Sequence, residues 1–341
     1  MIAERFTDPA EFFVVQAALE AGRSVTVQFS SSRHSTDSLR EVNRLAKLFN
    51  SALEVRFYGH YGEVFNFNVL SNLRDVSNFS ADCLDVARNF EQLAEMPVLK
   101  RLRLGIHHNT PPDLLAYKNL RNLEVLKLGP TKSSNLDLKY LEQYLNLSDL
   151  GLCGHTKEIE SVAESKNLKT LTLISMGNKQ SLSFVNTLPI LRRLTVLFGG
   201  RESIAEVSHP SLHALEIIRV KGLQVIDPDR FPALRCLSVE DQIKLTHIQF
   251  SNQTPLLEYV KIWNCKSLIS ITGIPTLTKL LSLGIAHTAV SFDSVHAQVK
   301  EGQLGDFVFH SQSRKENKTI QETLKRQGYG EHLLKHAFFA V

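Results

Sequence analysis

A short aliphatic motif recurs along most of the chain and limits its possible folds more than any other feature. The motif reads Leu-x-x-h-x-h, where h is aliphatic, and successive copies begin 21 to 24 residues apart. Self-similarity at a period of this length is typical of solenoids, in which each repeat buries its apolar face against its neighbours. The copies begin at Leu99, Leu123, Leu147, Leu168, Leu191, Leu212, Leu234 and Leu257, and a ninth is expected at Leu280.

Each copy predicts a short β-strand. The side chains of a strand alternate between its two faces, so the aliphatic residues of a copy enter the core and the residues between them point outward. In the copy at Leu168, we expect Leu171 and Leu173 inside and Thr172 outside. Stacked copies then form one parallel sheet with an extended concave surface, which is the surface that solenoids use for binding.

The motif weakens before Leu99, where we expect helices between the strands. Alternating apolar residues predict strands at Val25–Phe29 and Leu53–Phe57, and Leu73–Val76 matches the motif in degenerate form. Capping patterns and apolar stripes at helical spacing predict three helices. These begin near Asp8, near Ser38 and near Asp82, and the third ends at Met96.

The end of the chain differs again. The regular pattern stops after Ile285, and the segment from Thr319 to His336 predicts an amphipathic helix that covers the open edge of the sheet. We therefore expect helix-rich capping and degenerate repeats over residues 1–98, regular repeats over 99–290, and a C-terminal cap over 291–341. All three segments are expected to form one continuous domain.

The motif resembles that of leucine-rich-repeat proteins, and the resemblance covers most of the chain. It implies an α/β leucine-rich-repeat solenoid, or horseshoe, but no particular function. The segment from Pro255 to Leu268 resembles the irregular repeats of plant intracellular immune receptors and of cysteine-containing repeat families. The sequence has no phosphate-binding loop of the form G-x-x-x-x-G-K-[ST], so the nucleotide switch of such receptors is absent. The consensus asparagine is replaced by His107, Thr131, His155, Met176, Gly199, Val220, Gln242 and Cys265.

The composition agrees with a folded protein that does not cross a membrane. Hydrophobic residues make up 43% of the 341, and no apolar run approaches the ~18 residues that a spanning helix needs. The N-terminus lacks the basic and apolar regions of a signal peptide, so we expect a cytoplasmic location, or secretion by a route that needs no cleaved signal. The four cysteines have no metal-ligand or disulfide spacing. The net charge of +4 permits an acidic partner without requiring one.

The outward positions of the predicted strands provide the candidate binding residues. Early copies present a basic patch of Arg56, Arg101, Arg103 and Lys127. Later copies present the apolar side chains Ile174, Leu197, Phe198, Ile218, Tyr259 and Trp263, interleaved with Arg193, Glu216, Arg219, Glu240, Asp241 and Lys261. Apolar side chains surrounded by charge are typical of protein-binding surfaces, although these could instead pack only on one another. We expect Tyr259, Lys261, Trp263, Phe198 and Arg219 to form the centre of the surface.

Other functions have weaker support in the sequence. The basic patch lacks interleaved aromatic residues, which disfavours nucleic-acid binding. His332 and His336 have helical spacing, but no third ligand accompanies them, and we expect no metal or other cofactor. No catalytic arrangement can be assembled, so we expect neither an enzyme nor a small-molecule substrate. Two roles stay open for a protein that binds a protein partner: an intracellular inhibitor or immunity-type protein, and an effector or adaptor module in innate-immune or host-pathogen signalling.

Overall fold

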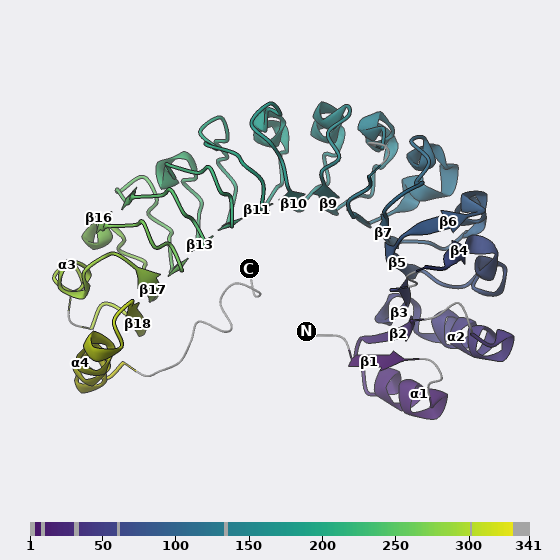
Figure 1. Cartoon of the computed structure of the whole chain (residues 1–341), viewed down its shortest axis with the longest axis horizontal. Helices are drawn as coiled ribbons and strands as arrows, with labels where there is room; N and C mark the ends of the chain where they lie inside the picture. The colour runs from purple at the N-terminus through teal and green to yellow at the C-terminus, as the bar shows by residue number, and fades with distance from the viewer. Residues whose placement is uncertain are drawn as a thin grey trace. The chain divides into compact units, whose positions relative to one another are not determined.

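The chain folds into two compact units of repeats. The computed structural model describes residues 4–7, 11–30, 34–59, 62–132, 136–300 and 302–329. Unit 1 is Met1–Leu168 and unit 2 is Lys169–Val341. In each unit the strands line one side and the helices line the other (Figure 1). The fold is the leucine-rich-repeat solenoid that the motif predicts. The segment boundaries at residues 98 and 290 remain predictions. The same holds for the single continuous domain.

The strands of unit 1 pair in parallel, each with the strand of the next repeat. Leu102 and Leu104 stand opposite Leu126 and Leu128, so equivalent residues of successive copies share one register. Their side chains are buried, as the motif predicts. The strands, in sheet order, are β1 (Glu4–Thr7), β2 (Val25–Phe29), β3 (Leu53–Tyr58), β5 (Asn78–Leu84), β7 (Arg101–Ile106), β8 (Val125–Leu128) and β9 (Asp149–Cys153).

Short helices connect the strands of unit 1. The Ser35 hydroxyl caps the longest one, α2, by accepting a hydrogen bond from the Ser38 amide at 2.9 Å. Leu39, Val42 and Leu45 then form its buried stripe. The helices are α1 (Phe12–Glu20), α2 (Thr36–Phe49) and the 3₁₀ helices η1 (Asn50–Ala52), η2 (Phe67–Asn72), η3 (Phe90–Glu95), η4 (Leu114–Ala116), η5 (Lys118–Asn122), η6 (Leu138–Gln143) and η7 (Ile159–Glu164). Strands β4 (Val64–Asn66) and β6 (Val86–Arg88) pair separately.

The predictions for residues 73–96 were wrong. Phe79 and Ala81 stand opposite Leu102 and Leu104, so the repeat before Leu99 has its strand at β5 rather than at Leu73–Val76. The helix expected over 82–96 is absent: its first residues belong to β5 and β6, and only η3 is helical. A phenylalanine and an alanine replace the aliphatic pair of the motif, which hid the strand. Residues 8–10, where the first helix was expected to begin, lie outside the described residues.

Unit 2 repeats the same parallel arrangement. Leu171 stands opposite Leu194, and Leu173 opposite Val196, all four buried, which confirms the predicted register. The copy at Leu280 is also confirmed, because Leu283 stands opposite Val260. The strands, in sheet order, are β10 (Thr170–Ile174), β11 (Arg193–Leu197), β12 (Ala214–Ile218), β13 (Cys236–Glu240), β15 (Tyr259–Trp263), β17 (Ser282–Thr288) and β18 (Asp306–Ser311).

The repeats continue beyond Ile285, contrary to the prediction. Strand β18 pairs with β17, and Phe307 and Phe309 stand opposite Leu283 and Ile285. The segment from Leu304 to Phe309 is therefore a further copy, in which phenylalanines fill the core positions. Unit 2 also contains η8 (Ser183–Thr187), η9 (Pro228–Arg230), η10 (Ile274–Thr276), α3 (Phe292–His296), and the paired strands β14 (His247–Gln249) and β16 (Ser270–Thr272).

The last described helix, α4 (Arg314–Arg326), begins five residues before the helix that we predicted. The Ser313 hydroxyl caps it by accepting a hydrogen bond from the Glu316 amide at 3.3 Å. Ile320 and Leu324 are buried, and the helix contacts β18. The predicted continuation beyond residue 329 lies outside the described residues. In the described part of the chain, no helix is long and apolar enough to cross a membrane.

Three residues that replace the consensus asparagine join neighbouring repeats through buried hydrogen bonds. The Nε2–H of His155 donates to the Gly129 carbonyl at 2.8 Å. The Gln242 amide donates to the Ile217 carbonyl at 3.2 Å. The Cys265 thiol lies 3.7 Å from the carbonyl oxygen of the preceding repeat. Each side chain satisfies a backbone acceptor, and those of Ile217 and Val239 belong to buried residues, where an unpaired carbonyl would cost free energy.

Candidate protein-binding surface

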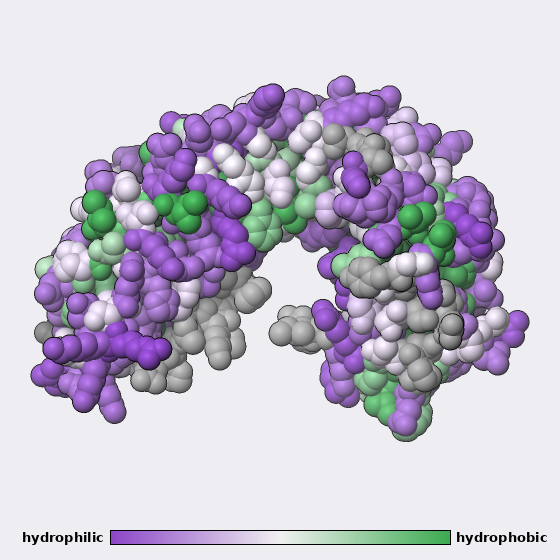
Figure 2. Space-filling model, in the orientation of Figure 1, coloured by the Kyte–Doolittle hydropathy of each residue, from purple (hydrophilic) through white to green (hydrophobic). Residues whose placement is uncertain are grey.

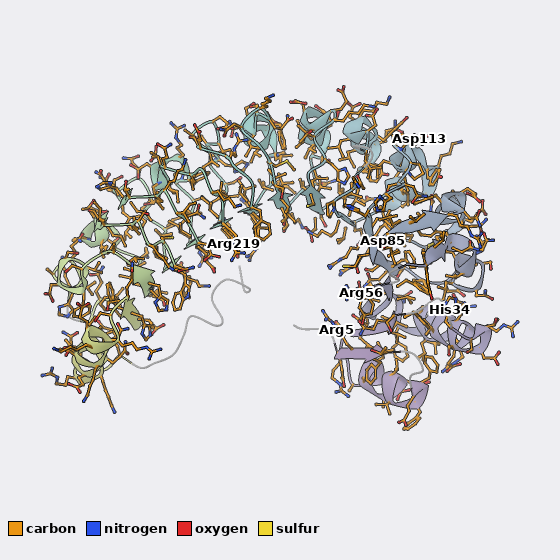
Figure 3. All side chains as sticks on the ribbon, in the orientation of Figure 1. Arg5, His34, Arg56, Asp85, Asp113 and Arg219 are labelled. Atoms are coloured by element: carbon orange, nitrogen blue, oxygen red, sulfur yellow. The ribbon has the colours of Figure 1, made fainter. Side chains whose placement is uncertain are left out.

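We call the side of each sheet that faces away from the core its open face. In unit 2, Arg219 lies on this side (Figure 3). In unit 1, Arg56 lies at the sheet, whereas Asp113 lies on the opposite, helical side. The sequence-predicted site residues divide between the two open faces: Arg56, Arg101, Arg103 and Lys127 belong to unit 1, and the others belong to unit 2.

Ion pairs between neighbouring strands order the open face of unit 2. Arg193 pairs with Glu216 at 3.5 Å, and Lys261 pairs with Glu240 at 2.7 Å. The Thr195 hydroxyl also donates to Glu216, at 2.9 Å. Pairs that are partly exposed add little stability, because water screens them, but they hold long side chains in one place. The charged residues that the sequence analysis treated as separate candidates are therefore partners of one another.

Two aromatic residues of β15 lie on this face in different environments. The Tyr259 ring packs on Ala214 and Cys236, which are buried although they occupy outward positions. Trp263 is half-buried, not exposed as expected. Its ring centre lies 5.8 Å from the Lys261 ammonium and 6.2 Å from the edge-on ring of His287. Both residues are half-buried, so each keeps part of its side chain exposed to solvent.

The apolar residues Ile174, Leu197 and Ile218 lie side by side on adjacent strands. Leu197 stands between the other two in the register, and all three are half-buried. They therefore pack on one another and still present some apolar surface. Figure 2 shows that the visible surface is mostly hydrophilic, with small, separate hydrophobic patches.

A row of residues with left-handed backbone follows the third outward position of six strands in unit 2, namely β10, β11, β12, β13, β15 and β17. The φ angles lie between 51° and 60°. The amides of Phe198, Arg219 and Asp241 each donate, at 2.9 Å, to the carbonyl of the outward residue in the next repeat. We call this the turn row: Ser175, Phe198, Arg219, Asp241, Asn264 and His287.

The turn row is the feature that the sequence analysis missed. The motif predicts Phe198, Arg219 and Asp241 as strand residues and gives no role to Asn264 or His287. The signal was present in the sequence, since each residue directly follows the third outward position of its copy. The left-handed backbone could not be foreseen, because Ser175, Phe198 and Arg219 are not of the residue types that favour it.

Neighbouring side chains of the turn row contact one another. The Arg219 guanidinium carbon lies 5.8 Å from the Phe198 ring centre, and Arg219 donates to Asp241 at 2.8 Å. The Asn264 amide donates to the other Asp241 oxygen at 2.5 Å. The hydrogen bond from Asn264 has the largest effect on the pKa of Asp241, which it lowers, and the bond from Arg219 lowers it further. Partial burial of the carboxylate acts in the opposite direction. We call Phe198, Arg219, Asp241, Asn264 and the adjoining Trp263 the aromatic strip.

The open face of unit 1 is of mixed charge rather than purely basic as predicted. Arg56 pairs with the buried Asp82 at 2.7 Å, and Lys127 pairs with Asp149 at 2.5 Å. Both acidic partners occupy outward positions that the sequence analysis did not consider. Arg101 and Arg103 are exposed and have no ion-pair partner among the described residues.

Metal binding has no support from the described geometry. Within the described ranges, no group of three or more His, Cys, Asp or Glu side chains is placed to hold a metal ion. His332 and His336 lie outside those ranges. The thiols of Cys236 and Cys265 are buried, which raises the pKa of each to about 11.

Comparison with known proteins confirms the fold. An internalin, InlF, from Listeria monocytogenes is 16% identical with a TM-score of 0.55, and the match covers 87% of this chain and 84% of that one. The Toll–Spatzle complex of Drosophila matches at 14% identity and a TM-score of 0.51, over 87% and 44% of the two chains. The complex of TLR13 with ssRNA13 matches at 15% identity and a TM-score of 0.54, over 84% and 45%. No protein-family model and no curated protein matches the chain. The fold is therefore that of leucine-rich-repeat proteins.

Proposed function

We propose that this chain is a non-enzymatic recognition protein that binds a protein partner through the aromatic strip on the open face of unit 2. The observation that carries the proposal is the left-handed Phe198, which is 40% exposed and lies against Arg219. A non-glycine residue in that conformation costs roughly 1–2 kcal/mol, and asparagine would meet the backbone requirement at lower cost. An exposed phenylalanine there does not serve the fold, so we assign it to binding.

The chemistry of the strip suits a protein partner. Phenylalanine, tryptophan and arginine are the residue types that contribute most to binding energy at protein interfaces. Here Arg219 and Asp241 hold each other, so little side-chain freedom is lost when a partner binds. The fold of Toll, whose solved complex contains Spatzle, offers a precedent for protein binding by this architecture.

Within this function we propose an inhibitor or immunity-type protein that covers a functional surface of its partner in the cytoplasm. A preformed face with ion-paired charges favours such blocking, because it needs no rearrangement to bind. The second candidate is an effector or adaptor module. The likeness in fold to Toll, described as a hub in development and innate immunity, favours that role.

The test is a capture experiment with matched variants. The tagged full chain is used as bait in a lysate of its native cells, and retained proteins are identified by mass spectrometry. We expect a partner that wild type retains and that Phe198→Asn with Trp263→Ala loses. The control is Phe13→Ala, which removes a 73% exposed phenylalanine from α1 and should leave capture unchanged. A partner retained equally by every variant would contradict the proposal. Activity of the purified partner, with and without the chain, then separates an inhibitor from an adaptor.

A further inference from the structure

The open face of unit 1 contains a groove of about 390 Å³ in which two arginines are not neutralised. Arg101 and Arg103 line it from β7, with Asn78 and Ser80 on one side and Lys127 on the other. Neither arginine has an ion-pair partner in the described part of the chain, whereas Lys127 is paired with Asp149. The unpaired positive charge of the groove therefore belongs to these two guanidinium groups.

The acidic residues of the groove are already engaged. Glu54 accepts hydrogen bonds from the hydroxyls of Thr26, at 2.9 Å, and Ser80. Asp149 is held by Lys127. The groove therefore offers a ligand ten guanidinium N–H donors. Its lining has a net positive charge, because the three cations Arg101, Arg103 and Lys127 outnumber the two carboxylates.

The spacing of the two arginines defines the ligand further. They are two residues apart on one strand, so their side chains leave the same face about 6.6 Å apart. Alternate side chains of an extended peptide have the same spacing. A guanidinium group also matches a carboxylate in shape, and can bind it through two parallel hydrogen bonds. The two arginines are thus arranged to receive two carboxylates from alternate residues of one extended segment.

We propose that this groove binds an extended acidic peptide segment, in which two Glu or Asp residues separated by one residue pair with Arg101 and Arg103. The inference goes beyond the proposed function, because it assigns a second binding site, in unit 1, and a chemical class of ligand. It does not depend on the aromatic strip. The occupant is an acidic segment of a protein rather than a nucleic acid, because no aromatic side chain lines the groove on which a base could stack.

The experiment measures the binding of a labelled synthetic peptide by fluorescence anisotropy. In this peptide glutamate alternates with glycine, and the full chain is titrated at low and at physiological salt. We expect Arg101→Gln with Arg103→Gln to weaken binding by about tenfold or more, since two charge-assisted pairs are lost. The control is Arg88→Gln with Arg121→Gln. It removes the same charge from two exposed arginines of unit 1 outside the groove, and should change the affinity by less than about twofold.

Four results would overturn the proposal. The first is equal weakening by both double variants, which would show an effect of net charge alone. The second is equal affinity for a peptide with glutamine in place of glutamate. The third is tighter binding of single-stranded RNA than of the peptide, lost in the Arg101 and Arg103 variant, which would assign the groove to nucleic acid. The fourth is no binding at millimolar peptide. Thermal melts show that each variant is folded, and the synthetic ligand makes the result independent of the capture experiment.

Discussion

Arg219 lies against the Phe198 ring, with 5.8 Å from its guanidinium carbon to the ring centre, and the same guanidinium donates two hydrogen bonds to Asp241. The three residues follow successive strands of unit 2. A cation over an aromatic face is worth about 0.5–1 kcal/mol at an exposed site. The contact is too weak to determine the fold, but it orders two large side chains that face solvent.

Trp263→Ala should separate binding from folding. We expect the partner affinity to fall by roughly 2 kcal/mol or more, as at the centre of an interface. Because the ring is half-buried, the unfolding free energy should also fall, by about 1 kcal/mol. Titration calorimetry and urea denaturation measure the two changes. A large loss of stability with binding intact in the folded fraction would place Trp263 in the core and the interface elsewhere.

Phe198→Asn should not destabilise the protein. Asparagine tolerates the left-handed backbone at this position, so the variant should be as stable as wild type or more stable by up to about 1 kcal/mol. Phe198→Ala is the matched control, because it removes the ring but keeps a side chain that disfavours this conformation. Urea melts of both variants make the comparison. An asparagine variant less stable than the alanine variant would refute the strain argument.

Core substitutions test the strand register. Leu171→Ala or Leu194→Ala should lower the unfolding free energy by about 2–5 kcal/mol, because each leaves a cavity in a fully buried stack. Thr172→Ala, at a half-buried outward position, should be far milder. Thr195→Ala is a separate case, since Thr195 is buried and its hydroxyl donates to Glu216, and it should cost about 1 kcal/mol. A Thr172 variant as unstable as the Leu171 variant would show that the register is wrong.

Gly273→Ala should be strongly destabilising. Gly273 has a φ of +80°, and a Cβ there would lie 1.9 Å from the Phe250 carbonyl oxygen, so the backbone must move. We expect a loss of about 3 kcal/mol or more in unfolding free energy. Gly302→Ala is the control: its φ of +72° is similar, but a Cβ would meet nothing within 4 Å. Equal thermal melts for the two variants would show that the close contact with Phe250 is unimportant.

The stability of the protein should fall in weak acid because of His155. Burial lowers the pKa of His155 below its ordinary value of 6.5, although the hydrogen bond to Gly129 acts in the opposite direction. The unfolded chain therefore binds the proton more readily. The contribution of neutral His155 to the unfolding free energy is complete above pH 6.5. It is lost as the pH falls below that value towards the pKa of His155 in the folded protein. Urea melts between about pH 7 and pH 5 should show a smaller decline for His155→Gln than for wild type. If stability declined equally in His155→Gln and in wild type, His155 would not be the cause of the loss in weak acid.

The repeat motif predicted most of the fold because it names the buried residues directly. Where leucine, isoleucine or valine fill the core positions, the register is right, as at Leu171 and Leu283. The strand was missed where other residue types fill the core positions. Phe79 with Ala81, and Phe307 with Phe309, occupy the same positions but break the aliphatic pattern.

The candidate site was less predictable because its character depends on contacts between repeats. The sequence shows that Lys127 and Arg101 both point outward, but not that Lys127 is neutralised by Asp149 while Arg101 is unpaired in the described chain. The sequence likewise cannot show that Tyr259 packs against Ala214 and Cys236. Such pairings join residues of different copies, and a motif within one copy carries no information about them.

Five of the six residues of the turn row donate a backbone hydrogen bond to the next repeat, whatever side chain each position carries. The amides of Phe198 and Arg219 donate to the next repeat in the same way as that of Asn264, although the three side chains share no chemistry. Under the proposed function, the residues that bind the partner can therefore change while these backbone bonds are kept. Codons at these positions can be randomised as a library, and new specificities selected from it, on a scaffold that stays constant.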